Sequence, residues 1–239
     1  MTKQEIVKKI ENGLIVSCQM ERHAPCYTED IIEIMAKAAL WGGACALRIN
    51  TPENVRKIRA LTDVPIIGLT KIFREDTDVF MTPDMGCVEE LIEAGADILA
   101  IDGTDRLIDG HPAHDIITEI REKYPDIPIL ADVRDEEDAV RSLKLGADFA
   151  APTFYRFKKN AKSTDVPDWE MFARMCRDCK DLGYVLMEGK VWTPDDAVRA
   201  LHYGALAVVV GSAITRPHLT ARRFYDHMNG FPETRSLLY

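Results

Sequence analysis

Polar or small residues follow eight short apolar runs spaced along the 239-residue chain. These residues are Gln19, Arg48, Lys71, Asp102, Asp132, Thr153, Glu188 and the neighbours Gly211 and Ser212. Lysine and carboxylate groups can move protons, while arginine and glutamine can hold a polar or anionic ligand. If the runs are parallel strands of a barrel, their polar ends meet at one mouth, where barrel enzymes carry their active groups.

Lys71 and Glu188 are the candidate proton-transfer groups. A lysine that is partly desolvated or close to other cations has a lowered pKa and can act as a base near neutral pH, and it could equally form a Schiff base. A solvated lysine at the rim of the barrel is the structural alternative. Burial of Glu188 would suit it to act as an acid or a base. Its alternative is a fixed counter-ion to Lys71 or Lys190.

The last two strand ends have the composition of a phosphate site. Gly211 and Ser212 are small enough for backbone N–H groups to approach a phosphate, and a short helix that starts near Ser212 would add its positive end. Phosphate sites formed after the seventh and eighth strands recur in (β/α)8 barrels. Gly189 and Lys190 supply the loop after the seventh run, and Arg216 is placed to clamp a phosphate with two hydrogen bonds.

A repeated phrase indicates the elements that position these residues. Gly43, Gly95, Gly146 and Gly204 are each followed by alanine and then by an apolar run. Glycine is favoured just after the end of a helix, and a spacing of roughly 50 to 60 residues corresponds to two βα units. Similar runs at residues 14–19, 64–71, 127–132 and 183–188 bring the count to eight. Continuous apolar runs are typical of strands that helices cover on both faces.

The sequence therefore predicts an α/β fold, a (β/α)8 TIM barrel with a short helix at residues 2–11 ahead of it. We expect one domain over residues 1–239, with a C-terminal tail at about 230–239. The predicted helix caps are Thr28, Thr51, Asp135 and Thr193. A doubly wound open sheet is the alternative, which the lack of a GxGxxG motif after the first strand makes weaker.

Composition excludes several classes of function. The chain has 30 Lys and Arg against 39 Asp and Glu, a net charge of −9, which argues against binding to nucleic acid. It has no apolar run long enough to span a membrane, and no leader sequence is expected. The six cysteines lack a disulfide or zinc spacing, and Cys176 and Cys179 fall in an amphipathic helical stretch. We expect a cytoplasmic protein that needs no metal and no cofactor.

With these residues in place, the chain resembles the bacterial N-acetylmannosamine-6-phosphate 2-epimerases over nearly its whole length. The resemblance lies in residues 15–19 (IVSCQ), 65–68 (PIIG) with Lys71, 81–83 (MTP), 95–97 (GAD) with Asp102, 131–132 (AD), 188–189 (EG) and 208–217 (VVVGSAITRP). It implies a sugar-phosphate substrate, catalysis by Lys71 and Glu188, and a homodimer. It also implies substrate contacts through Gln19, Arg48 and Asp132, and a phosphate clamp formed by Gly189, Gly211, Ser212 and Arg216. From their positions at the strand ends, we further expect Thr153 to contact the substrate and Lys190 to bind the phosphate.

The implied reaction interconverts N-acetylmannosamine 6-phosphate and N-acetylglucosamine 6-phosphate, a step of amino-sugar catabolism. When the sugar ring opens, the aldehyde at C1 makes the C2 hydrogen acidic, and two groups can then exchange the proton through an enol-like intermediate. The sequence departs from the family pattern at four places: Ile49, where alanine commonly follows the arginine of the second strand, Gly103, the loop that starts at Thr153, and Lys190 in place of arginine.

Two other readings stay open at this level. Another sugar-phosphate barrel enzyme is possible, such as a pentulose-phosphate 3-epimerase or a Schiff-base aldolase that uses Lys71. The six histidines fall mainly outside the strand ends, which counts against the metal-dependent 3-epimerase. A non-catalytic sugar-phosphate sensor would need only the clamp of residues 211–216, so the additional presence of Lys71, Asp132 and Glu188 argues against it.

Overall fold

Eight parallel strands close into a barrel in the computed structural model, which describes residues 1–158 and 166–230. The strands are β1 (Leu14–Cys18), β2 (Ala46–Asn50), β3 (Ile66–Leu69), β4 (Ile98–Asp102), β7 (Ile129–Asp132), β8 (Phe149–Ala151), β9 (Tyr184–Glu188) and β10 (Ala207–Val210). Strand β1 pairs in parallel with both β2 and β10, so the sheet has no edge. The predicted barrel is confirmed, and the alternative open sheet is wrong.

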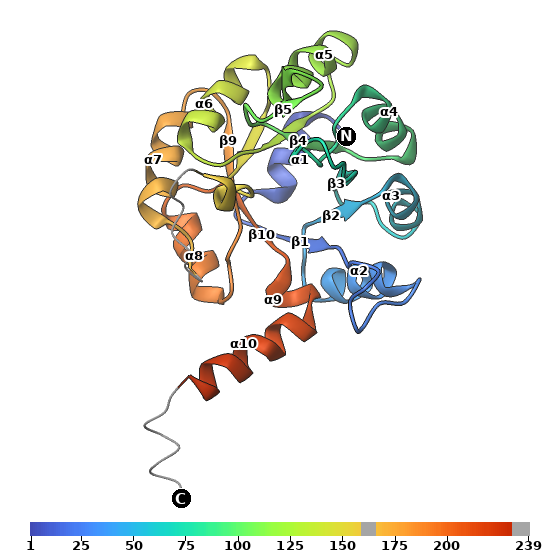
Figure 1. The fold of residues 1–239 in the computed structure, drawn as a ribbon, viewed down its shortest axis with the longest axis vertical. Helices are drawn as coiled ribbons and strands as arrows, with labels where there is room; N and C mark the ends of the chain where they lie inside the picture. Colours follow the sequence, from blue (N-terminus) through green and yellow to red (C-terminus); the bar gives the residue numbers. More distant parts are fainter. Residues whose placement is uncertain (159–165, 231–239) are drawn as a thin grey trace, which may run out of the picture.

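Helices surround the barrel and cover the outer face of its strands (Figure 1). They are α2 (Ile31–Trp41), α3 (Pro52–Arg59), α4 (Met85–Ala94), α5 (Ile116–Lys123), α6 (Glu136–Leu145), α7 (Trp169–Cys179) and α8 (Pro194–His202). Cys179 on α7 is buried in the core between helices and strands, and Cys176 packs against that core, as the amphipathic pattern predicted. None of the helices in the described part of the chain has the length and apolar character needed to cross a membrane.

A second apolar core fills the inside of the barrel. Helix α1 (Lys3–Ile10) confirms the predicted leading helix, and its Ile6 and Ile10 are fully buried with the inward-facing side chains of the strands. At the opposite end, Phe80, Met81 and Phe154 belong to the same core. The barrel is therefore packed solid at the end where its strands begin, which leaves only the other end available for a ligand.

Three of the four predicted caps hydrogen-bond to the start of their helix. The side chains of Thr51, Asp135 and Thr193 accept bonds from the backbone N–H groups of α3, α6 and α8. Thr28 does not cap a helix: α2 starts at Ile31 after Asp30, which makes no side-chain cap. The backbone carbonyl of Thr28, instead of its hydroxyl, accepts from the N–H of Ile31 at 3.1 Å, because the chain forms turns before the helix.

The four repeated glycines all have the left-handed backbone conformation that the pattern required. Their φ angles lie between +93° at Gly43 and +117° at Gly146. Gly95 and Gly146 directly follow α4 and α6, and a residue in this conformation ends a helix with little strain only when it is glycine.

Four further elements lie outside the regular βα pattern. A hairpin of β5 (Leu107–Ile108) and β6 (His111–Pro112) follows β4, and the short helix α9 (Ser212–Thr215) follows β10. Helix α10 (Pro217–Asn229) then projects away from the barrel, as Figure 1 shows, and has no buried residue. The tail expected at about 230–239 lies outside the described residues from position 231 onward.

Candidate active site

A cavity of about 340 Å³ lies at the mouth of the barrel formed by the carboxyl ends of the strands. Ten of the eleven predicted site residues line it: Gln19, Arg48, Lys71, Thr153, Glu188, Gly189, Lys190, Gly211, Ser212 and Arg216. Asp132 is the eleventh; it is fully buried and does not line the cavity. This volume is within the range of small-molecule sites. The barrel thus brings together residues that are up to about 200 positions apart.

Arg48 is the centre of the polar network beneath the cavity. Its side chain is only 1% exposed, and its Nη2 donates to a carboxylate oxygen of Asp132 at 2.6 Å. Its Nη1 donates to a carboxylate oxygen of Glu188. A planar guanidinium can hold two carboxylates in fixed directions, whereas a lysine could not. Arg48 therefore fixes the position of Glu188.

Asp132 is held from two sides. Thr153 donates its hydroxyl to the carboxylate oxygen that Arg48 does not contact. Burial and the nearby charge of Glu188 together raise the pKa of Asp132 to about 6, although Arg48 acts in the opposite direction. Asp102 ends the neighbouring strand, but it bonds to Arg106 and Thr104 instead of joining this network. The two aspartates are register partners on adjacent strands, but their side chains form separate hydrogen-bond networks.

Lys71 lies two residues beyond β3, and its side chain faces the cavity. Burial lowers the pKa of Lys71 to about 8, and the positive charges of Arg48 and Arg216 act in the same direction. Two interactions fix the backbone of Lys71. Its N–H donates to Oδ1 of Asn50 at 3.2 Å, and the residue forms an antiparallel β-bridge with Met81. Asn50, the last residue of β2, thus positions Lys71.

Glu188 is the last residue of β9, and it is paired with Arg48. The prediction of a fixed counter-ion to Lys71 or Lys190 is wrong about the partner, since no ion pair to either lysine exists among the described residues. Only one carboxylate of Glu188 and Asp132 lines the cavity, so Glu188 is the acidic group that can reach a ligand.

Gln19 presents an unsatisfied amide oxygen. Its Nε2 donates to the hydroxyl of Ser17 at 2.9 Å, while its buried Oε1 has no hydrogen-bond partner in the described structure. A buried polar atom without a partner costs about 1–3 kcal/mol. An N–H group of a ligand in the cavity would remove that cost.

The predicted phosphate clamp contains two cationic side chains, those of Lys190 and Arg216. Arg216 follows α9 and donates to the hydroxyl of Ser212 at 3.2 Å and to the exposed Glu21 at 2.6 Å. Lys190 lies over the ring of Tyr155 at 5.1 Å. The cavity is lined by five cationic side chains and one carboxylate: Arg48, Lys71, Arg156, Lys190 and Arg216 against Glu188. In a chain with a net charge of −9, this concentration of positive charge favours a small anion.

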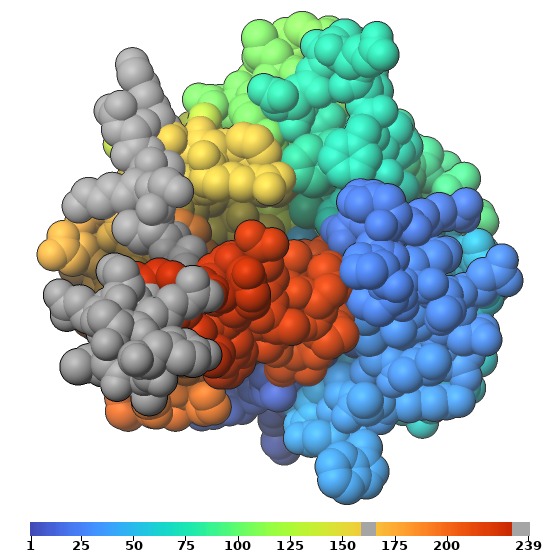
Figure 2. Space-filling model, turned by 60° about the horizontal axis from the view of Figure 1, so that its bottom comes forward, coloured from blue at the N-terminus to red at the C-terminus, as the bar shows by residue number. Residues whose placement is uncertain are grey.

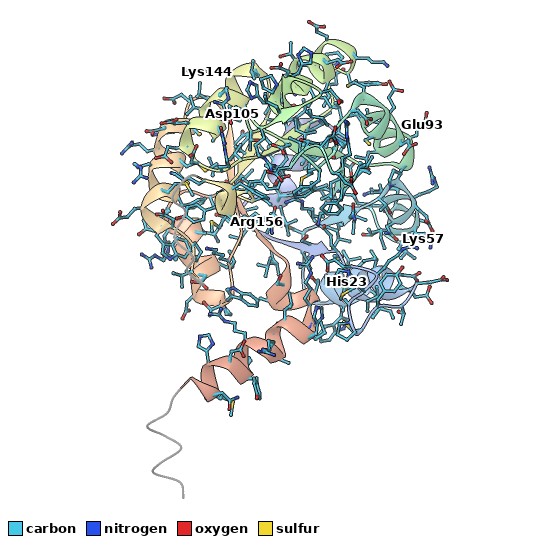
Figure 3. All side chains as sticks on the ribbon, in the orientation of Figure 1. His23, Lys57, Glu93, Asp105, Lys144 and Arg156 are labelled. Carbon is cyan, nitrogen blue, oxygen red and sulfur yellow. The ribbon has the colours of Figure 1, made fainter. Side chains whose placement is uncertain are left out.

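Nine lining residues were not among the predicted site residues: Ser17, Phe80, Met81, Phe154, Arg156, Val191, Trp192, Val209 and Thr215. Figure 3 labels Arg156 close to the barrel axis, in contrast with Lys57 and Lys144 on the outer helices. Arg156 stacks on Phe157 at 4.6 Å, in the basic and aromatic loop that departs from the family pattern. The loop composition was the available signal, but it could not show which of its cations turns inward.

Gly103, another departure, is explained by packing. A Cβ at this position would lie 2.7 Å from Oγ of Ser142 and 2.8 Å from Cβ of Ala131. Ordinary van der Waals contact between carbon atoms requires about 3.5–4.0 Å. In this chain the loop after β4 sits too close to α6 and β7 for the alanine that the family pattern carries there.

Comparisons with known proteins show the family to which the chain belongs. Residues 32–230 match the family described as "Putative N-acetylmannosamine-6-phosphate epimerase". A relative from Caldanaerobacter subterraneus, named "Putative N-acetylmannosamine-6-phosphate 2-epimerase", is 42% identical over 223 residues, covering 93% of each chain. A like-named protein of Borrelia garinii is 36% identical over 94% of this chain and 97% of its own.

Two solved structures show the same fold. That of the N-acetylmannosamine-6-phosphate 2-epimerase from Clostridium perfringens superposes with a TM-score of 0.85 at 32% identity, covering 92% of this chain and 95% of the other. The thiamine phosphate pyrophosphorylase from Pyrococcus furiosus has a TM-score of 0.57 at 19% identity over 88% of this chain and 89% of its own. At that identity the second likeness concerns the fold alone.

Proposed function

The chain belongs to the N-acetylmannosamine-6-phosphate epimerase family, and we propose that it interconverts N-acetylmannosamine 6-phosphate and N-acetylglucosamine 6-phosphate. One observation carries the proposal beyond family membership: Lys71, with its lowered pKa, and Glu188 line the same cation-rich cavity. Two groups able to exchange protons on one substrate are what inversion at a single carbon requires.

In the proposed mechanism the ring-opened sugar binds with its C2 hydrogen between these two groups. One takes the C2 proton while the other donates a proton to the opposite face, through an enol-like intermediate. In the reverse reaction the two exchange roles. Lys71 and Glu188 therefore hold one proton between them at the start of the reaction in either direction. The nearby charges of Arg48 and Lys71 stabilise the negative charge that develops on the C1 oxygen.

Asp132 takes a positioning role in this proposal instead of touching the substrate. Through Arg48 it fixes the direction of Glu188, and through its bond from Thr153 it fixes the wall of the cavity. A pKa of about 6 also allows Asp132 to hold a proton when the charge on Glu188 changes. The three carboxylate–guanidinium partners would then keep their geometry through both half-reactions.

The two ends of the substrate have matching groups. The free Oε1 of Gln19 accepts the N–H of the N-acetyl group in this proposal. Gly189, Lys190, Gly211, Ser212 and Arg216 hold the 6-phosphate, with Arg216 and Lys190 supplying the charge. With the amide and phosphate anchored, C2 lies between them, where Lys71 and Glu188 can reach it.

The test is direct observation of the reaction. The protein is incubated with N-acetylmannosamine 6-phosphate, and NMR follows the appearance of N-acetylglucosamine 6-phosphate. We expect turnover of this sugar and much slower turnover of unphosphorylated N-acetylmannosamine, which leaves the clamp empty. A folded protein that turns over neither sugar would refute the proposal. Borohydride in the presence of substrate should leave no adduct on Lys71, because an aldolase alone would form a Schiff base.

We further propose that the chain is a single-domain cytoplasmic protein that forms a homodimer. Phe224, Tyr225 and Met228 on α10 are 60–73% exposed, on a helix that buries none of its residues. Such side chains favour contact with a second copy. All six cysteines are free thiols, which suits a reducing compartment. Light scattering on the wild type and on Phe224→Glu tests the dimer, which the substitution should weaken.

A further inference from the structure

A cluster of soft, metal-binding side chains lies outside the cavity, between the loop after β1 and the start of α10. The Sγ of Cys26 is 3.8 Å from Sδ of Met20 and 3.3 Å from Nδ1 of His218. Each of the three side chains is half-buried. Figure 2 shows the orange-red C-terminal segment lying against the blue N-terminal one on this side of the molecule. Thiol, thioether and imidazole thus converge from positions nearly 200 residues apart.

The two separations from the Sγ of Cys26, to Met20 and to His218, each fit a pair of ligands that share one ion. With bonds of about 2.3 Å to sulfur and 2.0 Å to nitrogen, as found for zinc, angles of about 110–120° place two sulfurs roughly 3.8–4.0 Å apart and sulfur and nitrogen roughly 3.5–3.7 Å apart. The distances in the structure, 3.8 Å and 3.3 Å, differ from these by a few tenths of an ångström or less. Small side-chain rotations would admit an ion.

The donor set selects the kind of ion. Thiolate and thioether ligands favour Cu(I) over magnesium or calcium, which take oxygen ligands. A structural zinc site takes four nitrogen, sulfur or carboxylate ligands, and a thioether is not among them. Among the described residues no group of three His, Cys, Asp or Glu side chains is arranged to hold a metal, so the thioether of Met20 is essential to this set.

We propose that Met20, Cys26 and His218 form a binding site for one soft d¹⁰ cation, Cu(I) in chemical class. Binding replaces the thiol proton of Cys26, which leaves to solvent, and His218 coordinates as the neutral imidazole. No electron is transferred. The ion would tie the loop that contains Gln19 and Glu21 to the segment that contains Arg216 and His218, on the outer side of the phosphate clamp.

The experiment is an anaerobic titration of the full chain with Cu(I) in competition with bicinchoninate, while ultraviolet absorption reports thiolate–Cu(I) bonds. We expect one tightly bound equivalent that Cys26→Ser abolishes and that Met20→Leu and His218→Gln each weaken at least tenfold. Cys45→Ser is the matched control: Cys45 is another half-buried thiol, and its recorded partner is the backbone carbonyl of Leu14, so this variant should bind as the wild type does.

Two results would overturn the proposal. One is a Cys26→Ser variant that keeps the tight equivalent. The other is unchanged affinity in both Met20→Leu and His218→Gln, which would mean that a lone thiol holds the ion. Circular dichroism of each variant checks that the fold is intact. Because the readout is metal binding, the outcome is independent of whether the chain epimerises sugars.

Discussion

The alkaline limb of the pH–rate profile is a sensitive test of the assignment of Lys71. Epimerisation consumes no proton, so the forms of the Lys71–Glu188 pair that work in the two directions contain the same single proton. Loss of that proton at high pH must therefore stop both directions together, and kcat/KM reports the pKa of the free enzyme. With a pKa of about 8 for Lys71, activity should fall steadily above pH 8.

The size of the effect follows from the protonated fraction of Lys71. With a pKa of about 8, this fraction falls about 30-fold between pH 7 and pH 9.5, whereas a lysine with an ordinary pKa near 10.4 would lose only about a tenth of it. The second ionisation of the substrate phosphate lies near pH 6, so it does not contribute to the change in rate between pH 7 and pH 9.5. Initial rates by NMR across pH 6.5–9.5 give the profile.

Two variants test whether the positive charge near Lys71 determines the position of the alkaline limb. Arg216→Gln removes one of the positive charges that lower the pKa of Lys71, so the alkaline limb should move to higher pH. Lys190→Gln also weakens the phosphate clamp and raises KM, but it should leave the midpoint where it is in the wild type. A profile that stays flat from pH 7 to 9.5 in the wild type would refute the reasoning, as would identical midpoints in wild type and Arg216→Gln.

Substitutions at three positions, with Thr28→Ala as a control, test the framework around the site. Arg48→Met leaves Asp132 buried without a cation and should cost about 3–5 kcal/mol in urea unfolding at pH 8. The pKa of Asp132 is higher in the folded than in the unfolded state, so ionisation of Asp132 lowers the stability as pH rises through about 6. The stability difference between wild type and Arg48→Met should therefore shrink near pH 5. A variant as stable as the wild type at pH 8 would contradict this reasoning. Thr193→Ala should lower the free energy of unfolding by about 1 kcal/mol, because it removes the cap of α8. Thr28→Ala should change it by no more than about 0.5 kcal/mol. Similar losses in the two variants would argue against the cap assignment. Gly103→Ala should destabilise by about 1–3 kcal/mol in the same assay, and a neutral result would show that the loop after β4 can shift.

The barrel was predictable from sequence because its signals are local and repeated. Glycines at helix ends, such as Gly95 and Gly146, require a backbone angle that few other residues adopt, so their spacing reports the βα period. Cap residues such as Thr193 act within three positions of themselves. The prediction that Thr28 caps a helix was wrong because turns in the same loop provide backbone hydrogen bonds at the start of α2.

The ion pairs between the residues of the site could not be predicted from the sequence in the same way. Arg48 is 84 residues from Asp132 and 140 from Glu188, and only the closed barrel brings them together. Sequence spacing shows that each is near a strand end, but not how deep it lies. Arg48 is two residues before the end of β2, which places it beneath the mouth, where it pairs with two carboxylates. The depth of a side chain in the barrel depends on strand stagger, which no local pattern encodes.

The central claim is that Lys71 and Glu188 exchange a proton at C2 of the sugar. The most direct measurement is the reaction of N-acetylmannosamine 6-phosphate in D₂O, with the C2 position of the product read by NMR. We expect deuterium at C2 of N-acetylglucosamine 6-phosphate, and a loss of turnover of about 10²–10⁴-fold in a folded Lys71→Met variant. Product that retains protium at C2, or a Lys71→Met variant that turns over as fast as the wild type, would contradict it.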